Sequence, residues 1–131
     1  MEKKEFVNYV KHSEKNTIAL DFDGVVHKNS YGFGDGTIYD EPLDGALDSI
    51  RKIKSKGFDI VIYTCKANSK RPLIHGKTEV DLVWEWLKKH GVNHYIDDVV
   101  SEKPNAICYI DDKGVRFENW DKTMRFIDES M

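Results

Sequence analysis

The feature that most constrains this chain is a set of short apolar runs, each of which stops abruptly at a polar residue. The runs at residues 17–20, 58–63 and 106–110 end at Asp21, Thr64 and Asp111. Apolar runs of this length are typical of strands buried on both faces, as in a parallel sheet. Parallel strands present their carboxyl ends at one edge of the sheet, and ligands bind there. The pattern therefore predicts both a fold class and the place of a site.

Helix-like segments separate the apolar runs. Apolar residues recur at helical spacing in residues 2–12, 43–53, 79–90 and 120–127, and further short strands are expected at 95–100 and 115–117. The Gly- and Asp-rich residues 27–42 are expected to leave the sheet as an excursion that could form a hairpin flap. This alternation predicts an α/β fold built on a three-layer, doubly wound (Rossmann-like), mainly parallel sheet.

Length and composition limit the domain count and the environment. A chain of 131 residues predicts one domain over residues 1–131, and 40% hydrophobic with 33% charged residues is a globular balance. The net charge of −3 gives no general basic field, so a nucleic-acid partner is compatible with the chain but unsupported. No apolar run approaches the ~18 residues of a membrane span, which predicts no membrane contact and a cytoplasmic location. Cys65 and Cys108 lie in or beside apolar runs, which favours buried free thiols over a disulfide.

Charged and hydroxyl side chains gather where the predicted strands end. They are Asp21, Asp23 and Gly24 after the first run, Thr64 after the second, and Lys103, Asp111 and Asp112 around the last. Carboxylates packed together repel one another unless a cation lies among them, and oxygen ligands alone favour a hard ion such as Mg²⁺. A metal of this kind binds phosphate oxygens as well. Thr64 could then hold a phosphoryl oxygen, while Lys103 neutralises the remaining negative charge.

These residues also carry a family resemblance. Asp21-Phe22-Asp23-Gly24-Val25-Val26, Thr64, Lys103-Pro104 and Asp111-Asp112 resemble, in order and in strand context, the four signature motifs of the haloacid dehalogenase superfamily of phosphohydrolases. The match spans residues 17–117. It implies a Mg²⁺-dependent phosphomonoester hydrolase that acts through an aspartyl-phosphate intermediate.

The resemblance also implies individual roles. Asp21 would be the nucleophile, and Asp23 would be the acid that protonates the leaving oxygen and later the base that activates water. Asp21, the main-chain carbonyl of Asp23 and Asp111 would ligate the metal, and Asp112 would bind it through water or orient the other ligands. Lys103 precedes Asp111 by only eight residues, so Lys66 or Lys113 could fill its role instead.

Substrate contacts are expected beside the second motif and in the turn after the first. The expected contacts are Gly24, Thr64, Cys65, Lys66 and Arg71. Lys66 and Arg71, together with Lys70 and Lys77, are expected to form either an anion-binding rim or a solvated basic loop. Neither 27–42 nor 65–95 is long enough for a separate cap domain. An open site suits a phosphate exposed on a larger molecule, or closure by a second copy in a homo-oligomer.

Other interpretations of the same residues stay open. The substrate could be a small phosphometabolite, a nucleotide or a nucleic-acid 3′-phosphate. A non-catalytic phosphate-binding module or a receiver-like phospho-switch is the alternative function. The acidic pair Asp97-Asp98 repeats the Tyr-Ile-Asp-Asp string of 109–112 but is interpreted as a surface element. His27 could touch the substrate or be structural, and the three tryptophans are assigned to the core or an interface.

Overall fold

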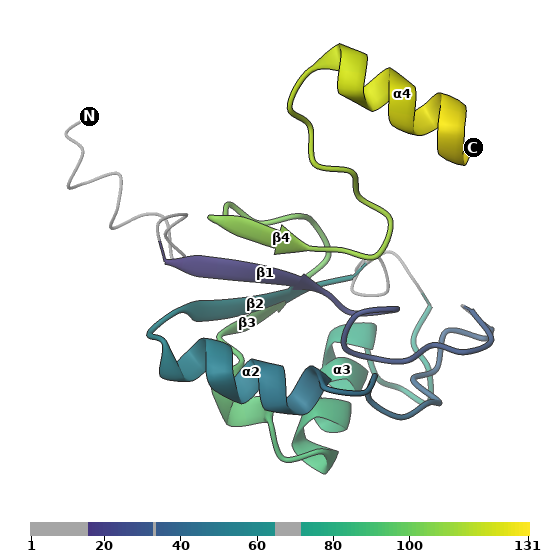
Figure 1. The fold of residues 1–131 in the computed structure, drawn as a ribbon. Helices are drawn as coiled ribbons and strands as arrows, with labels where there is room; N and C mark the ends of the chain where they lie inside the picture. The colour runs from purple at the N-terminus through teal and green to yellow at the C-terminus, as the bar shows by residue number, and fades with distance from the viewer. Residues whose placement is uncertain (1–15, 33, 65–71) are drawn as a thin grey trace, which may run out of the picture.

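The computed structural model describes residues 16–32, 34–64 and 72–131, which form an α/β domain around a four-stranded sheet (Figure 1). The strand order is β3-β2-β1-β4, and all neighbouring strands are parallel. The strands are β1 (Thr17–Asp21), β2 (Asp59–Tyr63), β3 (Asp98–Val100) and β4 (Cys108–Ile110). The predicted α/β class with a Rossmann-like, mainly parallel sheet is confirmed.

The central position of β1 follows from its apolar composition. β1 pairs with β2 on one side and with β4 on the other, and Ala19 is completely buried. In this register Asp21 lies opposite Tyr63, and Leu20 lies opposite Ile110. The carboxyl ends of β1, β2 and β4 therefore meet at one edge of the sheet, as the sequence predicts.

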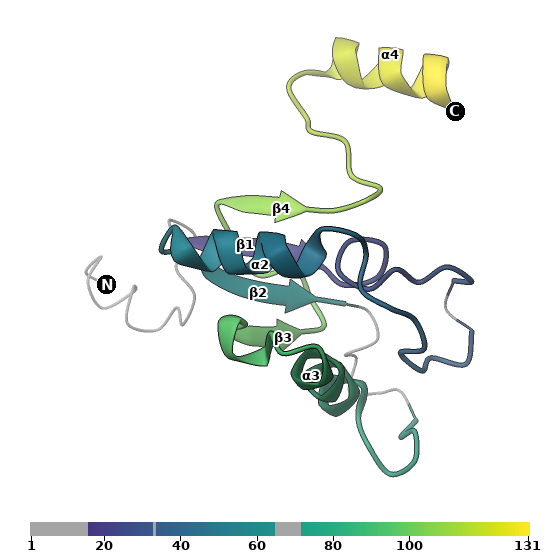
Figure 2. The ribbon, with the colours of Figure 1, turned by 60° about the horizontal axis from the view of Figure 1, so that its bottom comes forward.

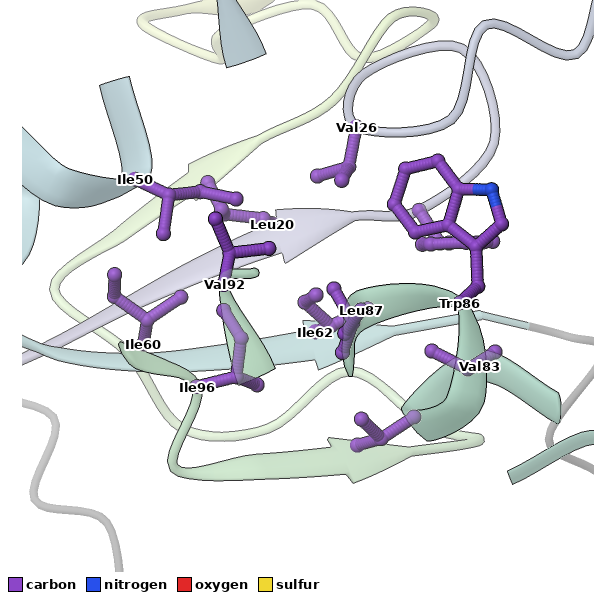
Figure 3. Packing of buried hydrophobic residues seen from close by; sticks show 12 residues of the cluster. Leu20, Val26, Ile50, Ile60, Ile62, Val83, Trp86, Leu87, Val92 and Ile96 are labelled. Atoms are coloured by element: carbon purple, nitrogen blue, oxygen red, sulfur yellow. The ribbon is translucent and has the colours of Figure 1, made fainter. Parts of the chain in front are cut away.

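Two helices cover one face of the sheet. Helix α2 (Ala46–Ser55) connects β1 to β2, and α3 (Glu79–Lys89) connects β2 to β3 (Figures 1 and 2). Their apolar faces meet the strand residues that point the same way, and these side chains form the core shown in Figure 3. The core is made of Leu20, Phe22, Val26, Ile50, Ile60, Ile62, Val83, Trp86, Leu87, Val92, Ile96 and Val99.

Local signals fix where α3 begins and ends. The Thr78 hydroxyl accepts a hydrogen bond from the Asp81 amide, while the Asp81 carboxylate accepts one from the Thr78 amide, which forms a capping box. The predicted stop at Gly91 is confirmed by its φ of 73°, a left-handed conformation that glycine adopts at little cost. The helix ends at Lys89, one residue before the predicted limit of residue 90.

Three strand and burial predictions need correction. The third strand covers only Asp98–Val100, because Asn93–Tyr95 form a 3₁₀ turn (η2) after α3. No strand forms at 115–117, because the chain turns sharply after β4, where the Asp111 carboxylate accepts hydrogen bonds from two following amides. The Cys108 thiol is free but exposed, because β4 lies at the sheet edge.

The C-terminal helix α4 (Trp120–Ser130) forms as predicted but does not close the domain. Its N-terminus is capped by the Asn119 side chain, which accepts a hydrogen bond from the Lys122 amide. The helix stands away from the sheet in both views, and Trp120, Met124 and Ile127 are exposed (Figures 1 and 2). In the described part of the chain, the two helices that pack on the sheet thus lie on the same face. The third layer that the sequence predicts is not formed there, because α4 does not pack on the other face.

Two further predictions concern the chain outside the sheet. The helix predicted at 2–12 lies outside the described residues. The excursion at 27–42 closes at its base through an antiparallel bridge between His27 and Pro42, but its described residues form no helix or strand. None of the helices in the described part of the chain is long and apolar enough to cross a membrane.

We expect the core between α3 and the sheet to dominate stability. Leu87→Ala removes a fully buried side chain and should lower the free energy of unfolding by about 2–5 kcal/mol. Leu73→Ala is the matched control, because this leucine is 61% exposed and its loss should cost less than about 0.5 kcal/mol. Urea denaturation of the two variants measures the difference, and equal losses would contradict this assignment of the core.

Candidate active site

Three carboxylates converge at the carboxyl edge of the sheet. Asp21 is the last residue of β1, and Asp111 and Asp112 directly follow β4. Each offers an oxygen within 4.8 Å of the oxygens of the other two. The parallel pairing of β1 with β4 produces this proximity, because both strands end at the same level of the sheet. Such a cluster can hold a divalent cation through oxygen ligands.

The environment of Asp21 differs from that of Asp111. Partial burial, followed by the charges of Asp111 and Asp112, raises the pKa of Asp21 from 3.8 to about 6. The pKa of Asp111 is lowered, first by the hydrogen bond from the Lys113 amide and further by the Tyr63 hydroxyl, the Gly114 amide and Lys103. In the absence of a cation, the Asp21 carboxyl therefore resists ionisation, whereas neighbouring donors hold the Asp111 carboxyl ionised.

Tyr63 is a site residue that sequence reasoning missed. Its hydroxyl donates a hydrogen bond of 3.0 Å to Asp111 Oδ2, and burial together with this bond raises the pKa of Tyr63. The only sequence signal was its place as the last residue of β2, level with Asp21. Tyr63 thus links the second strand to the carboxylate cluster.

Lys103 lies at the site despite its short separation from Asp111. Its Nζ is 4.0 Å from Asp111 Oδ2 and lies over the rings of Tyr109 and Tyr63, at 5.1 and 5.8 Å from their centroids. The Tyr109 hydroxyl donates to the carbonyl of Pro104, which holds the segment before β4 against that strand. This fold-back delivers the ammonium group to the cluster. Lys113 contributes its backbone amide to Asp111.

Gly24 is favoured by its backbone conformation, and it lies close to the side chain of Asp112. Its φ is +86°, and a side chain at this position would collide with the carboxylate of Asp112. The loop after β1 therefore lies directly against the residue that follows Asp111. This contact supports the predicted tight turn after Asp23.

The side chain of Asp23 has a different neighbour from the other acids. Its Oδ1 accepts a hydrogen bond of 2.8 Å from Nδ1 of His27, and it does not belong to the carboxylate cluster found among the described residues. The loop curls back after Phe22, whose carbonyl accepts hydrogen bonds from the amides of Val26 and His27. His27 is completely buried, which supports the structural interpretation of this residue. Metal ligation by the Asp23 carbonyl stays a prediction.

The remaining predicted site residues fall into two groups. Thr64 directly follows β2, is buried, and donates its amide to the Val100 carbonyl, so it lies at the same edge of the sheet. Cys65, Lys66, Lys70 and Arg71 lie outside the described residues.

The second acidic pair, Asp97-Asp98, which the sequence assigns to a surface element, is half-buried and lies where β3 begins. Asp97 directly precedes β3, at the end of the sheet opposite the cluster. Its carboxylate accepts hydrogen bonds of 2.7 Å from the Ile60 amide and from Lys54 Nζ.

An open cleft of about 530 Å³ adjoins the cluster. It is lined by Lys103, Ile107, Cys108, Tyr109, Asp111, Gly114, Val115 and Arg116. Two cations and one aromatic ring therefore lie beside the acidic site, in a volume typical of small-molecule pockets. Comparison of the chain with models of protein families, with curated proteins and with solved structures found no match.

The raised pKa of Asp21 predicts a pH dependence of stability. The folded protein binds this proton more tightly than the unfolded chain, so the contribution is complete below pH 3.8 and is lost as pH rises through about 6. Asn cannot ionise, so Asp21→Asn should be more stable than the metal-free wild type at pH 7, by about 1–2 kcal/mol after allowance for solvent screening.

Chemical denaturation between pH 4 and 8 in the presence of a chelator measures this difference. The advantage of Asp21→Asn should grow between pH 4 and about 6.5 and then level off. Asp48→Asn, on the exposed side of α2, is the control and should show no such trend. An advantage of Asp21→Asn that is constant with pH would contradict the electrostatic cause.

Proposed function

We propose that this protein is a Mg²⁺-dependent phosphomonoester hydrolase in which Asp21 is the nucleophile. The observation that carries the proposal is the convergence of Asp21, Asp111 and Asp112 within 4.8 Å, with Lys103 beside them. A structural turn explains a single acid at a strand end, but it does not explain three carboxylates that repel one another. The resemblance of the motifs to the haloacid dehalogenase superfamily supports the same function.

The donor set suits Mg²⁺. Asp21, Asp111 and Asp112 offer only oxygen atoms, and these carboxylates would hold the ion. When bound, Mg²⁺ would supply positive charge that neutralises the cluster and polarises the phosphoryl group. Lys103 would neutralise the negative charge that the ion does not. Its ammonium group lies on the same side of Asp111 as Tyr63.

The chain supplies the groups for two successive displacements. The Asp21 carboxylate attacks phosphorus while the bond from phosphorus to the leaving oxygen breaks, and Asp23 gives its proton to that oxygen. Asp23 then takes a proton from water, the water oxygen attacks phosphorus, and the bond to Asp21 breaks to release phosphate. Thr64 and the amides after the strands would hold phosphoryl oxygens during both steps.

The cleft beside the cluster suits a leaving group that is anionic or partly aromatic. Lys103 and Arg116 provide positive charge, and Tyr109 provides a ring against which an apolar group can pack. A small phosphometabolite, a nucleotide and a nucleic-acid 3′-phosphate all meet this description. The cleft is open, which favours substrates that extend beyond it.

The central prediction concerns turnover and its metal dependence. Wild-type protein should release phosphate from 4-nitrophenyl phosphate with Mg²⁺ and not with a chelator, and Asp21→Asn should reduce release to background because an amide cannot attack phosphorus. Asp48→Asn should retain wild-type activity, since its side chain is exposed on α2.

The other outcomes separate the alternatives. Normal turnover by Asp21→Asn would refute the mechanism. Mg²⁺-dependent labelling of wild-type protein by a phosphoryl donor, without turnover, would identify a phospho-switch instead. Absence of release and of labelling across nucleotides, sugar phosphates and 3′-phosphorylated oligonucleotides would indicate a module without catalysis.

The acid role of Asp23 predicts a dependence on the leaving group. Asp23→Asn should lower kcat/KM for an alkyl phosphate by roughly 10²–10⁴-fold, because an alkoxide needs the proton, and much less for 4-nitrophenyl phosphate. Steady-state kinetics with the two substrates measures the ratio. Equal losses on both would be evidence against the acid role.

A further inference from the structure

His27 is buried beside the proposed acid, and both of its ring nitrogens are engaged. Nδ1 lies 2.8 Å from Asp23 Oδ1, and Nε2 lies 3.1 Å from the backbone nitrogen of Asp40. A backbone N–H can only donate, so Nε2 must accept this bond and carries no proton. The neutral imidazole therefore holds its proton on Nδ1 and donates it to Asp23.

The surroundings of His27 fix the orientation of the ring. It stacks on Phe22 with centroids 5.3 Å apart, and the rings of Tyr39 and Trp86 meet it edge-on at 5.4 and 5.7 Å. The indole of Trp86, part of the core in Figure 3, also donates a hydrogen bond of 3.0 Å to the Asp40 carbonyl. The peptide groups on both sides of Asp40 are thus held, and the imidazole cannot turn without breaking contacts on several sides.

We propose that His27 is a positioning residue for Asp23. By donating to Oδ1, it orients the carboxyl group that carries and transfers the proton. Asp40 takes part as well, because its amide decides which imidazole nitrogen is protonated. This inference rests on the proposed hydrolase function, in which Asp23 is the acid and base.

Two substitutions separate the two hydrogen bonds of His27. The side-chain amide of His27→Asn can replace Nδ1 as donor to Asp23 but does not reach Asp40. His27→Gln can accept from the Asp40 amide in place of Nε2 but leaves Asp23 without its donor. Each variant therefore keeps one of the two hydrogen bonds. If His27 were purely structural, the loss of either bond would leave the dependence on the leaving group unchanged.

We expect His27→Gln to lower kcat/KM for an alkyl phosphate by roughly 10- to 100-fold more than for 4-nitrophenyl phosphate, as for other groups that orient a functional side chain. His27→Asn should keep the wild-type ratio of the two substrates. In the background of Asp23→Asn, His27→Gln should have no additional effect on this ratio. Equal losses on both substrates in His27→Gln, or an equal change of the ratio in both variants, would overturn the proposal.

A measurement on unsubstituted protein tests the geometry even if a variant does not fold. A long-range ¹H–¹⁵N spectrum of the Mg²⁺-loaded wild type should show the His27 proton on Nδ1, and a proton on Nε2 would overturn the proposal. Failure of the hydrolase function is recognised separately, because Asp21→Asn would then retain activity or the wild type would have none.

Discussion

Electrostatic repulsion among three carboxylates at the end of β1 is the constraint around which this site is arranged. Asp21, Asp111 and Asp112 are brought together by strand pairing, which the core stabilises independently of their charges. Burial, followed by the charges of Asp111 and Asp112, raises the pKa of Asp21, so the fold compensates this repulsion only in part. A scaffold that spends folding free energy to keep acids together is typical of a site whose charge is balanced by a ligand.

The compensation at Asp111 comes from three separate parts of the chain. Tyr63 reaches Asp111 from the neighbouring strand, Lys103 reaches it from the segment before β4, and the turn after β4 supplies two amides. All of these groups act on Asp111 rather than on Asp21. Asp111, which is assigned only to metal ligation, is therefore held ionised. Asp21, the proposed nucleophile, keeps a high affinity for a proton or a cation. This division matches the roles that the two acids would have in phosphoryl transfer.

The loop after β1 joins the chemistry to the core. Phe22 belongs to the hydrophobic core, Asp23 faces His27, and Gly24 packs against Asp112. Consecutive residues thus serve packing, the proposed proton transfer and the close approach to Asp112. On the opposite flank, β4, α4 and the segment between them expose apolar side chains such as Ile110, Phe117 and Trp120. The β1 side of the site is accordingly better packed than the β4 side.

The sequence by itself determined the parallel α/β class, the approximate extents of β1, β2, α2 and α3, and the acids that would meet at the sheet edge. Each of these follows from periodicity and from signals within one element, such as Gly91 after α3. Only the tertiary structure decided that Tyr63 bonds to Asp111, that Lys103 rests on two tyrosine rings, that Cys108 is exposed and that 115–117 is not a strand. These features depend on register and on how connections fold back across the sheet. A local pattern reports whether a residue is buried along its own element, but it does not report which distant side chain it meets.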